Sequence, residues 1–209
     1  MSGSIVYLLV VILGYCLGSL PTAYLLVKRK SRIDIRLAGS GNVGGLNAFE
    51  ISNSYVLGAT VVLVDILKGC IAVVLAGLFF GWKFMPMSVA GLSAIAGHNY
   101  PVWLTFHGGR GLATAAGTML ILCWCIVLVW VTAWGITYAY SRKLHLSNII
   151  ATICLPVVAG FLPDTISRFT LGNNSSPSGI FIVVLILSVL LLLTHKEHIR
   201  ELLSSHHNG

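Results

Sequence analysis

Charged residues are scarce in this sequence. Aspartate, glutamate, lysine and arginine make up only 9% of its 209 residues, and just 6 residues are acidic. A soluble domain carries about 25% charged residues, so the composition excludes an ordinary soluble domain. Hydrophobic residues make up 56% of the chain, and the mean hydropathy is +0.91. Because helices satisfy their own backbone hydrogen bonds in lipid, we expect an all-α polytopic membrane protein with a single domain over residues 1–209.

Several catalytic and metal-binding motifs are also missing. The chain has neither the Gly-x-Ser-x-Gly motif of a serine nucleophile nor a histidine followed by four residues and an aspartate, so we expect no covalent intermediate on serine. The 5 cysteines lie inside apolar runs, and no metal-ligand pattern is evident, so neither a metal nor a cofactor is expected. The net charge of +7 comes without a nucleic-acid-binding motif. We therefore expect anionic lipids or ligands as partners, and no nucleic acid.

Two polar, glycine-rich stretches interrupt the hydrophobic sequence. The first spans residues 36–47, and the second spans residues 98–111. Glycine accepts positive φ angles, and successive backbone amides in such turns can hold an anion. The first stretch offers Arg36, Gly39, Ser40, Gly41, Asn42, Gly44 and Asn47; the second offers His98, Asn99, His107, Gly108, Gly109, Arg110 and Gly111. Either stretch alone could be a simple turn between helices, but together they predict a phosphate site at one membrane face.

Seven apolar segments are expected to cross or enter the membrane. Five are single helices over residues 4–27, 52–80, 87–104, 144–162 and 180–194. The 31 residues between Arg110 and Arg142 are too few for two full crossings, which need about 40. We therefore expect two short helices that cross only part-way, with a turn near Cys123 to Cys125. The alternative is one long helix, which would place Arg142 and Lys143 outside.

The distribution of basic residues predicts the orientation, because cytoplasmic loops collect lysine and arginine. With the N-terminus outside and the C-terminus in the cytoplasm, the expected outer loops hold only Lys83 and Arg168. The expected inner loops and tail hold Lys28, Arg29, Lys30, Arg32, Arg36, Arg110, Arg142, Lys143, Lys196 and Arg200. Both glycine-rich stretches then lie on the cytoplasmic side.

A few polar residues within or beside the apolar segments are candidates for the same site. Ser19 could line the site or only pack. Lys68 could contact an anionic substrate, or pair structurally with Asp65, which lies three residues earlier on the same helical face. His98 could act in the site or cap a helix. His195 and His198 could belong to the site or to the membrane interface.

Three ordered motifs resemble the bacterial acyl-phosphate:glycerol-3-phosphate acyltransferase family, called PlsY. They are Gly18-Ser19-Leu20-Pro21 with the glycine stretch that follows it, Asp65-Ile66-Leu67-Lys68-Gly69, and Gly97-His98-Asn99-Tyr100-Pro101 with the second glycine stretch. A weaker match is His195-Lys196-Glu197-His198-Ile199. The resemblance implies a seven-segment enzyme of the bacterial plasma (inner) membrane with its active site facing the cytoplasm. It implies transfer of an acyl chain from acyl phosphate to the 1-hydroxyl of glycerol 3-phosphate, giving lysophosphatidic acid and phosphate for phospholipid biosynthesis.

Acyl phosphate is already activated, so we expect the protein mainly to position two anions and stabilise charge. The Ser40 hydroxyl and the backbone of residues 40–44 are expected to hold one phosphate. Arg110 and the amides of Gly108 and Gly109 are expected to hold another, with Arg36 and Lys68 as further contacts. The base is expected to be His98, another histidine or a substrate phosphate. Three asparagines are expected to orient hydroxyls or loops: Asn42, Asn47 and Asn99.

The sequence departs from the family pattern at several positions in or near these motifs. They are Glu50 in place of arginine, His107 and Arg110 in place of lysine, His198 in place of asparagine, and His145 and Asn148 in place of two serines. An arginine can still bind phosphate through two hydrogen bonds. The departures keep open a non-catalytic relative that binds lipid phosphates. A small-anion or lipid-phosphate transporter is the other alternative, although no internal repeat is evident and both polar stretches are expected on one face.

Overall fold

The chain folds as a bundle of helices. The computed structural model describes residues 3–205, without the side chains of residues 202, 203 and 205. Within that range there are helices, turns and two isolated bridges but no strand. The helices are α1 (Gly3–Gly18), α2 (Thr22–Ser31), η1 (Ile35–Leu37), α3 (Gly45–Ser52), α4 (Tyr55–Phe80), α5 (Phe84–Asn99), η2 (Val102–Leu104), α6 (Leu112–Leu122), α7 (Trp124–Ser141), α8 (Leu144–Phe161), α9 (Pro163–Arg168), α10 (Pro177–Leu193) and α11 (Lys196–Ser205).

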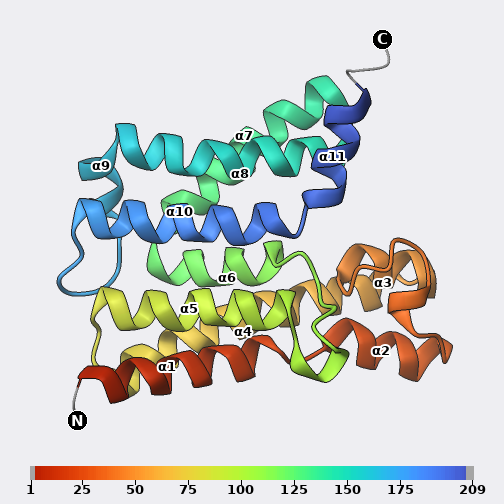
Figure 1. Cartoon of the computed structure of the whole chain (residues 1–209), viewed down its shortest axis with the longest axis horizontal. Helices are drawn as coiled ribbons and strands as arrows, with labels where there is room; N and C mark the ends of the chain where they lie inside the picture. The colour runs from red at the N-terminus through yellow and green to blue at the C-terminus, as the bar shows by residue number, and fades with distance from the viewer. Residues whose placement is uncertain (1–2, 206–209) are drawn as a thin grey trace.

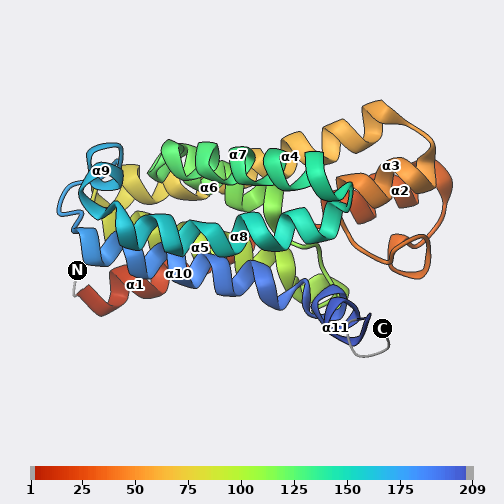
Figure 2. The ribbon, with the colours of Figure 1, turned by 90° about the horizontal axis from the view of Figure 1, so that it is seen from above.

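The long helices run along a common axis, and the polar segments gather at the two ends. Figure 1 shows α2, α3, α11 and the connection from α5 to α6 at one end, with α9 at the opposite end. The view from above shows the same separation (Figure 2). In the bundle α1 packs on α5, α4 on α6, and α7 and α10 on α8. Both glycine-rich stretches therefore lie at the same end of the molecule.

The structure supports a membrane protein. Within residues 3–205, 4 stretches are long and apolar enough to cross a bilayer: Gly3–Ser31, Tyr55–Phe80, Trp124–Ser141 and Leu144–Phe161. The prediction of two short helices over residues 111–141 is half right. Helix α6 has only 11 residues, but α7 has 18 and is long enough to span. The sequence argument allowed for a longer turn between the two helices. In the structure a single residue, Cys123, separates them, which leaves enough residues for α7 to reach full length.

The first apolar segment is interrupted rather than smoothly kinked. Helix α1 ends at Gly18, and α2 begins at Thr22 directly after Pro21, because proline lacks the N–H that a continuing helix needs. Helix α2 then runs beyond the expected end of the segment to Ser31 and is closed by Arg32, whose φ of 58° is left-handed. The residues of this break, Gly18 to Thr22, line a small cavity together with Val43 of the first glycine-rich stretch.

The expected loops contain more helix than the sequence predicts. The first polar loop includes η1 and the start of α3, and the expected outer loop includes α9. The expected segment 87–104 is helical earlier, from Phe84, and ends at Asn99 before η2. These short helices depend on tertiary packing, since helices of so few residues are marginal alone.

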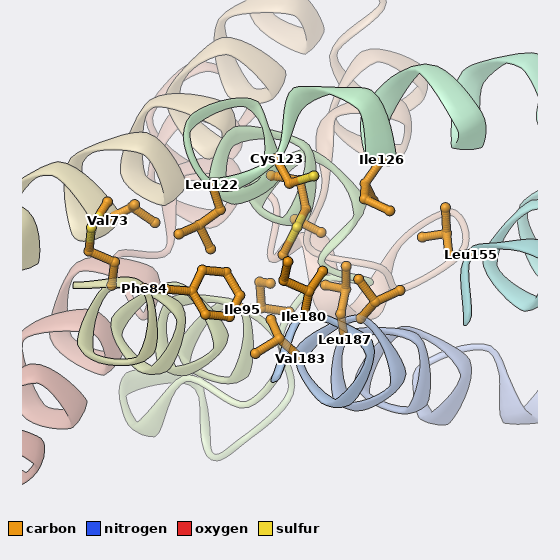
Figure 3. Packing of buried hydrophobic residues seen from close by; sticks show 14 of the residues in the cluster. Val73, Phe84, Ile95, Leu122, Cys123, Ile126, Leu155, Ile180, Val183 and Leu187 are labelled. Carbon is orange, nitrogen blue, oxygen red and sulfur yellow. The ribbon is translucent and has the colours of Figure 1, made fainter. Parts of the chain in front are cut away.

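The largest buried hydrophobic cluster lies between helices in the middle of the bundle. Figure 3 shows Phe84, Leu122, Ile126 and Leu187, which come from α5, α6, α7 and α10, in one buried cluster. Helices α1 and α5 approach closely at Gly14, where an added Cβ would collide with the carbonyl group of Ala90. Close packing at small residues is a common basis of helix association in membranes, and here it fixes α5, whose last turn carries His98.

Candidate active site

The two glycine-rich stretches are in direct contact. The amide of Val43, in the first stretch, donates a hydrogen bond to the carbonyl oxygen of Gly108, in the second, over 3.4 Å. An added Cβ on Gly109 would also lie 2.8 Å from the carbonyl oxygen of Val43. Segments about sixty-five residues apart in sequence therefore form one surface.

The side chain of Asn47 holds the first stretch in shape. It is buried, and its Oδ1 accepts a hydrogen bond from the Ser40 amide at 3.1 Å. Its Nδ2 donates to the carbonyl oxygens of Ile35, Ala38 and Asn42. All of its amide group is thus used within the stretch, so Asn47 organises the loop from within, which is one of the two roles expected for it.

The remaining members of the first stretch form an open turn. Gly39 and Gly41 have positive φ angles of 58° and 69°, while Ser40 is exposed. The Ser40 amide is occupied by Asn47, which corrects the expectation that this amide holds phosphate. Asn42 and Gly44 precede α3, which begins at Gly45. The first-turn amides of a helix have no intrahelical acceptor, so the amides at the start of α3 remain for an anion, together with those of Asn42 and Gly44 just before it.

Arg36 is already paired with a carboxylate. Its Nε and Nη2 atoms donate to Asp34 at 3.0 and 2.7 Å, and Nη1 donates to the carbonyl oxygen of Leu104 at 3.4 Å. The hydrogen bonds from Arg36 lower the pKa of Asp34, so the pair stays ionised near neutral pH. Arg36 therefore ties the first stretch to the second, and binding an anion would require it to share its charge with Asp34.

Three ionisable side chains meet beneath the first stretch. Nζ of Lys68 lies 2.8 Å from Oδ1 of Asp65 and 2.7 Å from Nδ1 of His98. All three side chains are buried, and they line a small cavity that also includes Ser19. Both roles considered for Lys68 remain compatible with this geometry, because the ion pair with Asp65 borders a cavity. Ser19 lines the same cavity, but its hydroxyl already accepts a hydrogen bond from Trp103 at 3.0 Å.

The contact with Lys68 decides which nitrogen of His98 carries the proton. A lysine ammonium only donates hydrogen bonds, so Nδ1 of His98 must be the unprotonated acceptor. The other nitrogen, Nε2, then carries the hydrogen and points toward Gly109, where an added Cβ would clash with it. In this arrangement His98 is a hydrogen-bond donor, so it does not offer the free lone pair that a base requires.

The glycine amides of the second stretch are also occupied. Gly108 donates to the carbonyl oxygen of Asn99, and Gly109 donates to that of His98, both at 3.1 Å. This corrects the expectation that these two amides hold phosphate. Asn99 is buried, and Gly111 has a φ of 81° with no room for a Cβ beside the Asn99 side chain. The backbone of this stretch therefore serves to aim the side chain of Arg110.

His107 lies apart from the other histidines. It is exposed, and its Nδ1 donates to the carbonyl oxygen of Thr105 at 2.7 Å within the same turn. The structure thus places its ring against its own turn.

Arg110 lies among three histidines from the last part of the chain. Its Nη1 is 3.1 Å from Nδ1 of His145, at the start of α8. The ring of His145 lies 3.8 Å from the ring of His198 and 6.5 Å from that of His195, measured between centroids. Thr194 donates to the carbonyl oxygen of Arg110 at 3.1 Å, which fixes the second stretch to the end of α10. The sequence predicts Arg110, His195 and His198 here; it names His145 only as a departure from the family pattern.

His195, near this cluster, has one ring nitrogen without a partner among the described residues. The residue is 2% exposed, and Nδ1 donates to the carbonyl oxygen of Leu191 at 2.8 Å. Its Nε2 is therefore an unprotonated acceptor, and it has no partner among the described residues. Burial lowers the pKa of His195. The hydrogen bond to Leu191 raises this pKa, and the positive charge of Arg110 lowers it further. Burial likewise lowers the pKa of His198, with Arg110 contributing.

An apolar cavity begins beside Arg110. It lies between α6, α7, α8 and α10, and Leu112 and Leu191 line its end near Arg110. Ala116 and Met119 of α6 and Trp130 of α7 also line it. The cationic side chain of Arg110 therefore adjoins an apolar cavity, an arrangement suited to a ligand with a charged head and an aliphatic tail.

Comparisons with known proteins agree with these features. Residues 8–205 match the family model described as glycerol-3-phosphate acyltransferase. The chain is 34% identical over 193 residues to a Glycerol-3-phosphate acyltransferase of Brucella canis, covering 92% of this chain and 88% of the relative. It is 33% identical over 199 residues to the enzyme of the same name from Mesorhizobium japonicum, covering 94% and 92%.

Two crystal structures share the fold. Both are of PlsY (YgiH), an integral membrane glycerol 3-phosphate acyltransferase, one in the glycerol 3-phosphate form and one in the lysophosphatidic acid form. They are 30% identical to this chain, with TM-scores of 0.78 and 0.77, and the alignments cover 95% of this chain and 92% of each structure. The chain belongs to the glycerol-3-phosphate acyltransferase family.

Proposed function

We propose that this protein transfers an acyl chain from acyl phosphate to the 1-hydroxyl of glycerol 3-phosphate, forming lysophosphatidic acid and inorganic phosphate in phospholipid synthesis. The observation that carries the proposal is the position of Arg110. On one side, Gly109 contacts His98 and the first glycine-rich stretch. On the other, Leu112 lines the apolar cavity. Arg110 thus stands where a phosphorylated head and an acyl tail would meet.

Both substrates carry phosphate, and the site offers two places for it. One is the start of α3 with the Ser40 hydroxyl, where helix amides and positive dipole favour an anion. The other is Arg110, whose guanidinium, within the described residues, donates one of its five N–H groups to His145. The acyl chain would occupy the apolar cavity. Family membership supports the substrates, and the adjacency of the two anion sites supports their encounter.

The reaction needs a proton acceptor for the attacking hydroxyl. The hydroxyl oxygen forms a bond to the acyl carbon, the bond from that carbon to the phosphate oxygen breaks, and phosphate leaves. Among the described residues, His195 has a buried ring nitrogen with a free lone pair, and substrate phosphate is the second candidate. His98 donates from Nε2 and is assigned to binding or orienting an oxygen.

We extend the proposal to the topology of the protein in the membrane. Helices α5, α6 and α10 join the four long stretches as shorter segments, giving seven. The end with both glycine-rich stretches carries Lys28, Arg29 and Lys30 in the last turn of α2. By the positive-inside rule this end faces the cytoplasm, with the N-terminus outside and the C-terminus inside. The compartment would be the bacterial inner membrane.

The test is turnover by purified protein in detergent, given acyl phosphate and labelled glycerol 3-phosphate. The Arg110→Ala variant should lose about 100-fold or more of the activity, as expected on removal of a group that stabilises transition-state charge. Arg168→Ala is the matched control, because Arg168 is exposed in α9 at the opposite end of the bundle. Wild-type turnover by Arg110→Ala would remove this residue from the site, and no product from the wild-type protein would overturn the function.

A further inference from the structure

His145 contacts both Arg110 and His198, although the three residues lie in separate parts of the chain. Arg110 precedes α6, His145 lies in the first turn of α8, and His198 lies in α11. The Arg110 Nη1 to His145 Nδ1 distance is 3.1 Å, and the centroids of the two imidazoles are 3.8 Å apart. His145 is therefore held by two groups: the guanidinium of Arg110 at its Nδ1 atom and the ring of His198 packed against its own ring.

The donor and acceptor roles in this contact follow from chemistry. A guanidinium has five N–H donors and no acceptor, and it stays charged in proteins. A hydrogen bond from Arg110 therefore requires an unprotonated Nδ1 on His145. The hydrogen of neutral His145 is then on Nε2. Without this acceptor, the long arginine side chain would lose the contact that orients its tip.

Among the described residues, no other side-chain acceptor forms a hydrogen bond with the guanidinium, and Thr194 holds the carbonyl oxygen of Arg110 separately. The negative charge of Glu197 favours the charged form of Arg110, but Glu197 does not form a hydrogen bond with it. The orientation of the Arg110 tip thus depends on a single imidazole nitrogen, while its remaining N–H groups are available for a ligand.

We propose that His145 is a positioning residue for phosphate binding: its Nδ1 accepts a hydrogen bond from Arg110 and holds the guanidinium toward the phosphate of a substrate. The proposal rests on the proposed function, because it assumes that Arg110 binds phosphate. The phosphate could belong to glycerol 3-phosphate or to acyl phosphate. His198 supports the arrangement by packing against the ring of His145.

The test compares two substitutions of His145 in the full-length protein in detergent. His145→Phe keeps a ring for packing against His198 but removes the acceptor. His145→Asn keeps an acceptor oxygen near the position of Nδ1. We expect His145→Phe to raise the KM for one of the two substrates about tenfold or more, the size of losing a hydrogen bond to a charged group. We expect His145→Asn to restore that KM to within a few-fold of wild type.

Measuring the KM for each substrate separately identifies the source of the phosphate. A rise for glycerol 3-phosphate alone assigns Arg110 to the acceptor, and a rise for acyl phosphate alone assigns it to the donor. Tyr140→Phe serves as control, because Tyr140 is 89% exposed at the end of α7 and has no part in the site. Thermal unfolding of each variant separates loss of fold from loss of positioning.

Two outcomes would overturn the proposal. In one, His145→Phe folds and shows wild-type KM for both substrates. In the other, His145→Asn folds and is as impaired as His145→Phe, which would indicate a role of the imidazole itself. Either result leaves the proposed function standing, since wild-type turnover and its loss in Arg110→Ala are measured in the same assay.

Discussion

The ammonium of Lys68 bridges two groups on different helices, with Nζ 2.8 Å from Asp65 Oδ1 and 2.7 Å from His98 Nδ1. Lys68 and Asp65 belong to α4, and His98 lies in the last turn of α5. The bridge holds the imidazole against Gly109 of the second glycine-rich stretch, where an added Cβ would clash with Nε2 of His98. One buried cation thus connects the membrane core to the site.

Removing this cation should destabilise the protein. Lys68→Met leaves Asp65, which is 3% exposed, as a buried carboxylate without its partner. Breaking a buried pair typically costs about 3–5 kcal/mol. We expect a marked fall in the thermal unfolding temperature in detergent, together with loss of turnover as His98 loses its orientation.

A double variant separates the two effects. Lys68→Met combined with Asp65→Asn removes both charges, so we expect it to recover much of the stability but not the activity. If Lys68→Met alone unfolded at the wild-type temperature, the ion pair would have no structural role.

Gly109 is the point where the two glycine-rich stretches and His98 come together. Gly109→Ala would place a Cβ against Nε2 of His98 and 2.8 Å from the carbonyl oxygen of Val43, so something must move. We expect at least a tenfold fall in kcat/KM. Gly135→Ala is the matched control, since an added Cβ there meets nothing within 4 Å. Equal activity in the two variants would contradict this placement.

The apolar cavity should determine which acyl chains are accepted. Ala116 lines it from α6, so Ala116→Phe would fill part of the space. We expect the variant to lose activity with long acyl phosphates while retaining it with short ones, measured as the ratio of kcat/KM across a series of donors. Ala139→Phe, at an exposed position of α7, should leave the ratio unchanged. A uniform loss with every donor would argue against this cavity as the acyl site.

Acid should weaken the docking of the C-terminal segment through His195. Burial lowers the pKa of this imidazole in the folded protein below the ordinary value of about 6.5. As pH falls through 6.5, the unfolded chain takes up a proton that the folded protein resists, so the free energy of unfolding decreases. We expect a lower unfolding temperature at pH 5.5 than at pH 7.5.

His195→Asn provides the comparison for this effect, because its amide can still donate to the carbonyl oxygen of Leu191 but does not titrate. The drop between the two pH values should be smaller in this variant. An equal drop would assign the acid sensitivity to other groups.

Much of this protein follows from its sequence. The scarcity of charge and the length of the apolar runs establish an all-helical membrane protein, because lipid leaves the backbone few alternatives. The glycine-rich stretches and their order indicate the family. The distribution of basic residues in the loops and the C-terminal tail indicates which polar segments lie at the same end of the helix bundle.

Only the tertiary structure decided which groups of those stretches remain free. Local sequence shows that Gly108, Gly109 and Ser40 have amides, but not that Asn99, His98 and Asn47 already accept from them. It also could not place His145 against Arg110, since 34 residues separate them and two helices fold in between. Hydrogen bonds between distant segments depend on how helices pack. The sequence therefore determines the membrane fold and the residues available, and packing determines which of them can bind a substrate.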